Sequence, residues 1–400
     1  MSSPITRKLS QRLVVETMLH SAPISRAELA KVTGLSKQTV SEVVDVLERD
    51  GWAHPTGRTN GRIGRTAMNY ELRRDAAFVL GVDLGGTKIA AALANVACHI
   101  VAERTVATDP RGGMFVIGQI GALLNELVIT AGIDRRQILL SVLGSPGVLD
   151  QTGGIAFAPN VAGLEALDVP AELAAALGCP VTIENDVNLA VLGERWHGSA
   201  TGCENVAFLA LGTGIGLGLV SGGQLMRGAR GAAGEIAYLP LGANPASPSA
   251  RHQGALEEAI GAPGISRRFA CHGGAAAATV ASIFDASAAG DVAARRTLDE
   301  TAALTARAIL SVVAVIDPEC VVLGGSIGAR DEMVALVRHH YGVIAPAPLT
   351  IAASALGSRA GLVGALAVAL NRLHNQLFGI HDLTGALTLP SPTPVAEAAQ

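Results

Sequence analysis

The sequence is poor in charged residues, in cysteine and in long apolar runs, and each shortage excludes a class of protein. Asp, Glu, Lys and Arg make up 16% of the 400 residues and hydrophobic residues make up 49%, which is too apolar for a disordered chain. The 5 cysteines are scattered without a CxxC pair, which excludes a disulfide framework and a cysteine-rich metal site. The longest apolar runs reach about ten residues, whereas a membrane-spanning helix needs about 20. The N-terminus lacks the apolar core of a signal peptide, so we expect a cytoplasmic protein without a membrane partner.

Glycine, in contrast, is abundant, with 47 residues. Residues 78–95 and 206–223 each read as a strand, a glycine turn and a second strand, which indicates two related halves. Strand and helix patterns alternate through the rest of the body, and this predicts an α/β fold. A dinucleotide-binding fold is disfavoured because a strand, not a helix, follows each glycine turn. Such hairpins suit phosphate groups that backbone amides surround, although plain tight turns would explain either one alone.

Charge is divided unevenly along the chain. Residues 1–75 hold 12 Lys and Arg against 8 Asp and Glu, whereas residues 76–400 hold 18 against 26. A basic head on an acidic body suggests an anionic partner, most simply nucleic acid. An ordinary solvated surface would account for the same charge balance.

The basic head has the pattern of a helix-turn-helix. Ser25 followed by Glu28 is a capping box that starts a second helix, and Gly34 lies in the turn that follows it. Ser36 caps a third helix, which Gly51 ends. The side chains expected to face the core are Leu13, Val14, Thr17 and Met18 in the first helix and Val40, Val43, Val44 and Leu47 in the third.

Residues 52–70 then alternate enough to form a hairpin, the wing of a winged helix-turn-helix. The early face of the third helix is polar and can reach base edges in a major groove, and arginines on a glycine-rich hairpin suit a minor groove or the phosphate backbone. We therefore expect operator DNA as a partner, with a small protein-binding domain as the alternative. The expected DNA contacts are Lys37, Gln38, Thr39 and Ser41 on the helix and Arg58, Arg62 and Arg65 on the wing.

Several short motifs occur in a fixed order along the body. They are Gly81-Val82-Asp83-Leu84-Gly85-Gly86-Thr87-Lys88, Ser145-Pro146-Gly147, Pro159-Asn160, Glu184-Asn185-Asp186-Val187-Asn188, Leu211-Gly212-Thr213-Gly214-Ile215-Gly216, Gly231-Ala232-Ala233-Gly234-Glu235-Ile236 and Leu323-Gly324-Gly325. In this order the chain resembles the ROK family (repressors, open reading frames, kinases) over residues 1 to about 380. A helix-turn-helix before such a body is the arrangement of the family's repressors.

The resemblance implies an α/β chain in which an N-terminal winged helix-turn-helix precedes a two-lobed actin/hexokinase-like (ribonuclease H-like) sugar kinase fold. The domains expected are residues 1–75 for the DNA-binding head, 76–200 for the first lobe, 201–382 for the second lobe and 383–400 for a flexible tail.

The resemblance also implies two sets of ligand-binding residues. Short amides and carboxylates suit the hydroxyl groups of a sugar, and Asp186 matches the base that deprotonates the phosphorylated hydroxyl in the kinases. For Asn185 and Asp186 a helix N-cap is an alternative that is compatible with a ligand role. The sugar-binding residues implied are Gly147, Asn160, Asn185, Asp186, Glu235 and Glu257. The ATP- or phosphate-binding residues implied are Asp83, Gly85, Gly86, Thr87, Gly212, Thr213, Gly214, Gly324 and Gly325.

The chain departs from the family where most members carry a histidine and a cysteine-rich zinc cluster. Tyr238 stands at the histidine position, and residues 248–257 contain none of the three cysteines. A four-ligand zinc site cannot be built from Pro, Ala and Tyr, and a lone His252 is more often a surface or core residue. Glu257 keeps the place of the glutamate that touches sugar in relatives. We therefore expect no zinc and no other bound metal.

Taken together, these features predict a sugar-responsive regulator, most simply a repressor of carbohydrate uptake or metabolism genes, associated with nucleoid DNA. A monosaccharide or sugar phosphate between the lobes would be the effector, and no cofactor would be required. The alternative is an ATP-dependent sugar kinase that uses ATP and Mg, with Asp186 as the catalytic base; a binding module without DNA or catalysis is a third. Since two-fold operators are read by two-fold proteins, we expect a homodimer or a dimer of dimers.

Overall fold

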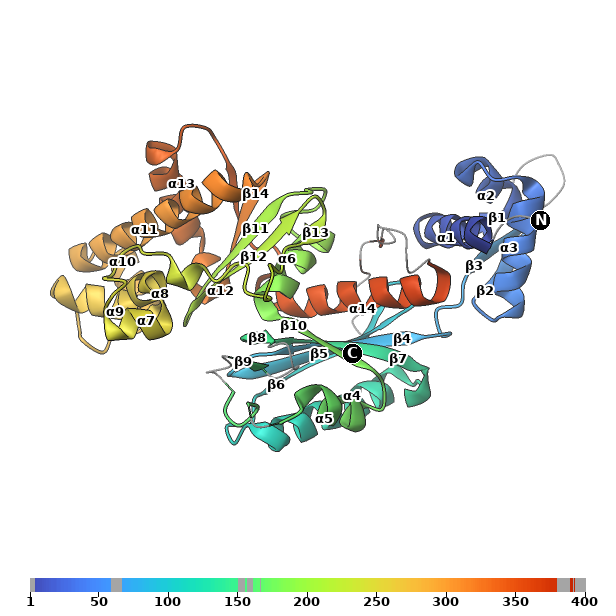
Figure 1. The fold of residues 1–400 in the computed structure, drawn as a ribbon, viewed down its shortest axis with the longest axis horizontal. Helices are drawn as coiled ribbons and strands as arrows, with labels where there is room; N and C mark the ends of the chain where they lie inside the picture. The colour runs from blue at the N-terminus through green and yellow to red at the C-terminus, as the bar shows by residue number, and fades with distance from the viewer. Residues whose placement is uncertain are drawn as a thin grey trace. The chain divides into compact units, whose positions relative to one another are not determined.

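The computed structural model describes residues 4–58, 67–149, 155–156, 161–165, 167–379, 389–390 and 392. The chain divides into two compact units that interleave along the sequence (Figure 1). Unit 1 comprises Met1–Ser145, Gly153–Glu184 and Ala365–Gln400, and unit 2 comprises Pro146–Thr152 and Asn185–Gly364.

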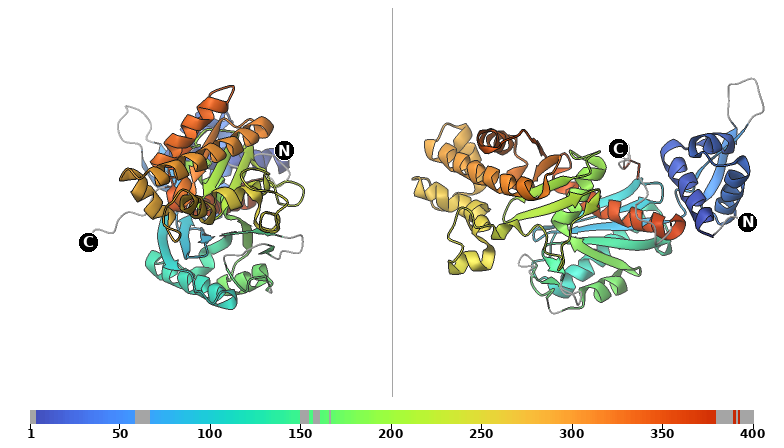
Figure 2. Two further views of the ribbon diagram at one scale, coloured as in Figure 1. Left: turned by 90° about the vertical axis from the view of Figure 1, so that its left-hand side faces the viewer. Right: turned by 45° about the horizontal axis from the view of Figure 1, so that its top comes forward.

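The head of unit 1 packs helices around a small sheet (blue in Figures 1 and 2). The capping box is confirmed, because the Ser25 hydroxyl accepts the Glu28 amide at 3.3 Å while the Glu28 carboxylate accepts the Ser25 amide at 3.1 Å. Gly34 ends the second helix at φ 71°, and the Ser36 hydroxyl accepts the Thr39 amide at 3.1 Å. The elements are α1 (Pro4–Ser21), β1 (Ile24–Ser25), α2 (Arg26–Thr33), α3 (Lys37–Arg49), β2 (Ala53–Arg58) and β3 (Met68–Leu72), with the strand order β1-β3-β2.

The core of the head differs from the expected one in α1, where Thr17 is only half-buried. Leu13 is 37% exposed, whereas Val15, which was not expected in the core, is completely buried beside Val14 and Met18. The buried stripe of α1 therefore runs one residue further along the chain than the sequence pattern indicates. All four core residues expected on α3 are buried.

The main sheet of unit 1 has the strand order β10-β7-β4-β5-β6. Strands β4 and β5 form the predicted hairpin, with Asp83 opposite Ala90, and β7 lies parallel to β4. Helices α4 and α5 lie on one side of this sheet and α14 on the other (Figure 1). The elements are β4 (Phe78–Leu84), β5 (Lys88–Asn95), β6 (Ile100–Ala107), α4 (Gly113–Ala131), η1 (Arg135–Gln137), β7 (Ile138–Ser145), α5 (Val169–Leu177), β10 (Val181–Asn185) and α14 (Ala360–Phe378), together with the short β8 (Val148–Leu149) and β9 (Ile155–Ala156).

Helix α4 is more apolar than the sequence analysis indicated. By length and composition alone it could cross a membrane. However, Val116, Ile120 and Leu124 on one of its faces are buried. The core helices of soluble proteins can be equally long and apolar, so a single helix of this kind does not indicate a membrane span.

Unit 2 repeats the strand arrangement of unit 1. Its sheet has the order β13-β12-β11-β14-β15, in which an antiparallel hairpin precedes parallel strands. The predicted relation between the two halves is therefore visible in the topology. The elements are α6 (Asp186–His197), β11 (Val206–Leu211), β12 (Ile215–Ser221), β13 (Gln224–Leu225), η2 (Ile236–Tyr238), α7 (Pro248–Gln253), α8 (Ala255–Ile260), α9 (Ala262–Cys271), α10 (Val280–Ala288), α11 (Val292–Ile316), β14 (Cys320–Gly324), α12 (Gly325–Gly328), α13 (Asp331–Ile344), β15 (Thr350–Ala353) and η3 (Gly357–Arg359).

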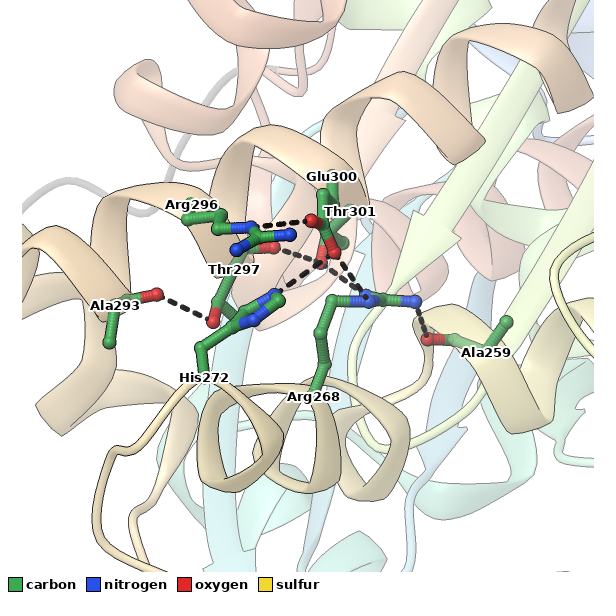
Figure 3. A network of polar contacts seen from close by, with 8 residues as sticks. All are labelled: Ala259, Arg268, His272, Ala293, Arg296, Thr297, Glu300 and Thr301. Carbon is green, nitrogen blue, oxygen red and sulfur yellow. Dashed lines mark hydrogen bonds and ion pairs between the residues drawn. The ribbon is translucent and has the colours of Figure 1, made fainter.

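The helices of unit 2 are joined by polar contacts as well as by an apolar core. Glu300 on α11 accepts a hydrogen bond from Arg296 at 3.0 Å and lies 3.0 Å from the His272 ring (Figure 3). Arg268 on α9 donates to the Thr301 hydroxyl at 2.8 Å and to the Ala259 carbonyl at 2.9 Å. This network ties α8, α9 and α11 together on one side of the sheet.

Candidate functional site

The first candidate ligand group lies at the start of α6. Asn185 is the N-cap, and its Oδ1 accepts the amides of Val187 at 3.1 Å and Asn188 at 3.2 Å. Its Nδ2 donates to the carbonyl of Gly147 at 3.1 Å. One amide side chain thus fixes both the helix terminus and the neighbouring loop, and the N-cap alternative accounts for the two bonds to its Oδ1.

Asp186 occupies the first turn of the same helix. Its Oδ1 accepts the Val187 amide at 2.8 Å. A negative charge is stabilised at this end of a helix by the macrodipole and the unpaired amides. A carboxylate held here can accept hydrogen bonds from the hydroxyl groups of a ligand, and it could also receive a proton from one.

Glycines in the neighbouring strand position this helix. A Cβ at Gly216 would lie 2.8 Å from the Val187 side chain, and one at Gly218 would overlap the Val187 carbonyl. The first turn of α6 can therefore approach the backbone of β12 only because both residues lack a side chain. This is the local reason for the glycines after the Gly212–Gly214 turn.

The second candidate group consists of two half-buried carboxylates. Glu257 on α8 accepts the Ile215 amide at 2.9 Å. Burial raises the pKa of Glu257, and the hydrogen bond from Ile215 partly opposes this rise. Burial and the nearby charge of Glu257 together raise the pKa of Glu235. Two close carboxylates with raised pKa values are suited to holding hydroxyl groups, because either can accept a hydrogen bond and its protonated form can donate one.

The structure therefore brings the predicted sugar-binding residues of unit 2 into two groups. Asn185 lies with Gly147, next to Asp186, and Glu235 lies near Glu257. Asn160 lies outside the described residues.

The first predicted phosphate loop connects β4 to β5 in unit 1. The Gly85 amide donates to the Lys88 carbonyl at 2.9 Å, and the Gly85 carbonyl accepts the Thr108 hydroxyl at 2.7 Å. Gly86 and Thr87 are exposed at the tip. At the end of β4, burial raises the pKa of Asp83 to about 6, although the charge of Lys88 works in the opposite direction.

The second predicted phosphate loop is formed by two adjoining turns of unit 2. Gly212 donates to the Gly214 carbonyl at 2.9 Å, and β14, which ends at Gly324, lies parallel to β11. Gly324 and Gly325 also have a packing role, because a Cβ would overlap the Phe208 ring at the first and the Leu211 backbone at the second. Steric demand is therefore one reason for glycine at both positions, and their phosphate-binding role stays a prediction.

A cavity of about 460 Å³ opens beside these turns. Its volume falls in the usual range for small-molecule sites. The Arg330 guanidinium at its edge stacks on the Phe284 ring at 4.4 Å. The lining residues are Thr213, Ala262, Pro263, Ser266, Ala278, Thr279, Val280, Ala281, Ser326, Ile327 and Arg330.

Helices α7 and α8 occupy the segment where the family resemblance implies zinc in other members. The Tyr238 hydroxyl donates to the His252 carbonyl at 3.1 Å, and Ser249 donates to the Glu258 carboxylate at 3.0 Å. Among the described residues, no group of three or more His, Cys, Asp and Glu could hold a metal ion.

The candidate DNA-contacting face lies on α3. Lys37 and Gln38 are exposed in its first turn, whereas Thr39 and Ser41 are less prominent: Ser41 is half-buried and accepts a hydrogen bond from Arg26 at 2.8 Å. The Thr39 hydroxyl lies 2.8 Å from that of the capping Ser36. The side chain of Arg58, and all of Arg62 and Arg65, lie outside the described residues.

Arg26 contacts a residue of this face, although the sequence analysis did not single it out. It forms an ion pair with Asp45 at 2.7 Å and lies over the Tyr70 ring at 4.8 Å. It therefore joins α2, α3 and the wing strand β3. The available signal in the sequence was its position directly after the N-cap Ser25, at the start of α2.

Comparison with known proteins matches both parts of the chain. Residues 79–372 match the ROK family and residues 5–63 match the MarR family. A xylose repressor of Bacillus subtilis is 26% identical over 63% of this chain and 65% of its own length. The chain spans less than two thirds of the length of the curated repressors that it matches first.

Two solved structures support the fold. A ROK hexokinase from Thermus thermophilus is 31% identical, with a TM-score of 0.65 over 74% of this chain and 99% of its own. A ROK family transcriptional regulator, a homologue of the E. coli MLC protein, is 20% identical, with a TM-score of 0.74 over 93% of this chain and 98% of its own. The predicted α/β class, with helix-turn-helix elements before a sugar kinase-like fold, is confirmed. The chain belongs to the ROK family and carries a MarR-type helix-turn-helix segment ahead of its ROK segment.

Proposed function

We propose that this protein is a sugar-responsive, DNA-binding transcriptional repressor of carbohydrate genes. The observation that carries the proposal is the first turn of α3, which Ser36 caps and where Lys37 and Gln38 are exposed. A capped helix that presents polar side chains beside a two-stranded wing is suited to the major groove. The names of the repressor relatives support the same function.

The DNA contacts proposed divide into two kinds. Lys37, Gln38, Thr39 and Ser41 would face base edges and adjacent phosphates, and the arginines of the wing, Arg58, Arg62 and Arg65, would neutralise phosphates. Arg26 would support this face from behind through its bond to Ser41. A dimer would present two such faces to the half-sites of a two-fold operator.

The effector proposed is a monosaccharide or its phosphate. The amide of Asn185 and the carboxylates of Asp186, Glu235 and Glu257 would accept hydrogen bonds from its hydroxyl groups, with Asn160 and Gly147 completing the contacts. Since xylose and hexoses are named for the relatives, both classes of sugar belong in a test panel.

A second candidate function is ATP-dependent sugar phosphorylation, and the cavity beside Thr213 and Ser326 favours it. The cavity could accept a nucleoside, and the turns at Gly212–Gly214 and Gly324–Gly325, with the Gly85–Thr87 turn, would hold its phosphates. Magnesium-bound ATP would supply the phosphoryl group, and Asp186 would take the proton of the attacking hydroxyl.

One experiment tests the repressor and separates it from the kinase. An operator is selected from random duplexes with the full chain, and binding is then followed by fluorescence anisotropy during titrations with xylose, glucose and their phosphates. Sugar-dependent release of a selected sequence is the expected result. Failure to enrich any DNA sequence would contradict the proposed repressor function. Phosphate transfer from ATP to any sugar of the panel would support the second function.

A further inference from the structure

Two cysteine side chains of unit 2 lie in contact although they are far apart in the sequence. The Sγ of Cys203 lies 3.7 Å from the Sγ of Cys320. Cys203 lies in the turn between α6 and β11, and Cys320 is the first residue of β14. A disulfide bond requires the two sulfurs to be about 2.05 Å apart. The two sulfurs are therefore in contact but would have to move closer together to form a bond.

The backbone around both cysteines is held by a separate set of hydrogen bonds. The Glu319 carboxylate accepts the amides of Glu204 at 2.5 Å and Asn205 at 2.8 Å. The Glu319 amide donates to the Asn205 carbonyl at 2.9 Å. These bonds join the residues next to each cysteine, so the fold keeps the thiols paired without a covalent bond.

The two thiols differ in accessibility. Cys203 is partly exposed, whereas Cys320 is buried among Val206, Phe208 and Val322. Burial and the neighbouring Cys203 raise the pKa of Cys320 to about 12. Cys203 is therefore the thiol that a dissolved oxidant meets first, and the buried Cys320 is protonated at neutral pH.

We propose that Cys203 and Cys320 are an oxidation site that forms an intramolecular disulfide in response to hydroperoxides. The Cys203 thiolate attacks one oxygen of the peroxide, the O–O bond breaks, and a sulfenic acid forms while water or an alcohol leaves. The Cys320 sulfur then attacks the Cys203 sulfur and the S–O bond breaks. The hydroxyl group leaves as water with the Cys320 proton, so two thiols and one peroxide give one disulfide, one water and one water or alcohol.

The disulfide bond would join the turn after α6 to the start of β14. It would close a loop that contains β11, β12 and α7 to α11. Closing a long loop restricts the unfolded chain, so the oxidised protein should unfold at a higher temperature than the reduced one.

The test uses the full chain without DNA or sugar, so its outcome is independent of the proposed function. Reduced protein is freed of reductant, treated with hydrogen peroxide, alkylated and digested with trypsin. We expect two thiols per chain to disappear and the tryptic peptides of residues 196–227 and 308–330 to be cross-linked. Dithiothreitol should reverse both the cross-link and the rise in unfolding temperature.

Three variants complete the design. Cys203→Ser and Cys320→Ala should each abolish the cross-link, and Cys271→Ser, which removes an exposed thiol on α9, should leave it unchanged. Peptide mapping of the unmutated chain decides the proposal even if Cys320→Ala fails to fold. Conversion of Cys203 to a sulfinic acid while Cys320 remains a free thiol would overturn it, as would a Cys203 disulfide between two chains.

Discussion

The ring of Trp52 meets the ring of Phe378 edge to face, with centroids 5.6 Å apart and planes at 89°. Trp52 directly precedes the wing strand β2, and Phe378 is the last residue of α14 and is only 2% exposed. One turn earlier on α14, the His374 ring lies 2.7 Å from the Val96 carbonyl. The end of α14 is therefore packed against both the head and the main sheet of unit 1.

The beginning of α14 belongs to unit 2 and has its own close partner. A Cβ at Gly364 would overlap the Leu189 carbonyl of α6, and one at Gly193 of α6 would overlap the Ala360 carbonyl. One continuous helix thus contacts, at its two ends, the helix that begins at Asp186 and the tryptophan beside the wing.

Substitution of Phe378 should test this connection. Phe378→Ala removes a buried ring and should cost about 3–5 kcal/mol of unfolding free energy. In a double-mutant cycle with Trp52→Ala, the pair should show a coupling of about 0.5–1.5 kcal/mol. Chemical denaturation of the four proteins measures it. Strictly additive effects on the unfolding free energy would mean that the two rings contribute independently.

Removal of the wing arginines should change how operator binding depends on salt. Each phosphate that the protein no longer neutralises reduces the steepness of log affinity against log salt by about 0.9. Arg62→Ala with Arg65→Ala should therefore weaken binding and flatten the slope by about twice that amount. Arg136→Ala, which removes a side chain that is 90% exposed in unit 1, is the matched control. An unaltered slope in the double variant would exclude the wing from the DNA interface.

Asp186→Asn should impair the effector response without changing the ligand-free protein. Hydrogen bonds to charged groups contribute about 1.5–3 kcal/mol, so the affinity for the sugar should fall roughly tenfold or more. DNA affinity without sugar should stay the same, and any sugar phosphorylation should be abolished, because an amide cannot take the hydroxyl proton. Asp168→Asn is the control, since Asp168 caps α5 through the Ala171 amide. A normal sugar titration of operator release in Asp186→Asn would place the sensor elsewhere.

Asp83 should make stability depend on pH in a defined window. Its pKa is raised from 3.8 to about 6 in the folded chain, so the folded state binds a proton that the unfolded state has already released between these values. The contribution is complete below about pH 4 and is lost as the pH rises to about 6, a change of about 3 kcal/mol. Asp83→Asn should thus become progressively more stable relative to the unsubstituted chain over this window and level off above it. A stability difference that is constant from pH 4 to 7, measured by urea denaturation, would contradict the raised pKa.

Zinc should be absent from the purified protein. The segment where the family resemblance implies zinc in other members carries α7, and Tyr238 donates to the His252 carbonyl there. Elemental analysis of protein prepared without chelators should give far less than one zinc per chain. A stoichiometric amount would show that other residues supply the ligands.

Local sequence signals predicted the local features of the fold well. The capping box at Ser25, the cap at Ser36 and the hairpins around the glycine turns depend on residues a few positions apart, so the sequence pattern carries them directly. The buried face of α1 was predicted one residue too early, because Leu13 and Val15 are both apolar. Only the packing against the rest of the head decides which of the two is buried.

Contacts between distant segments could not be predicted in the same way. Nothing near Trp52 in the sequence indicates Phe378, and nothing near Cys203 indicates Cys320. At Gly324 and Gly325, which the family resemblance implies as phosphate-binding residues, the close approach to Phe208 and Leu211 is a further steric requirement that only the folded chain reveals. The family resemblance supplied the candidate ligand residues, whose roles stay predictions.

The repeated strand order has a consequence for how the chain avoids aggregation. In the described part of the chain each large sheet is open, with β6 and β10 at the edges in one unit and β13 and β15 in the other. Three of these edges are short, at 5, 2 and 4 residues. The longer β6 places Glu103 and Arg104 at its centre, and charged residues on an edge discourage the addition of a foreign strand. The second sheet therefore doubles the number of these edges, yet none of the four is a long apolar strand on which chains could assemble.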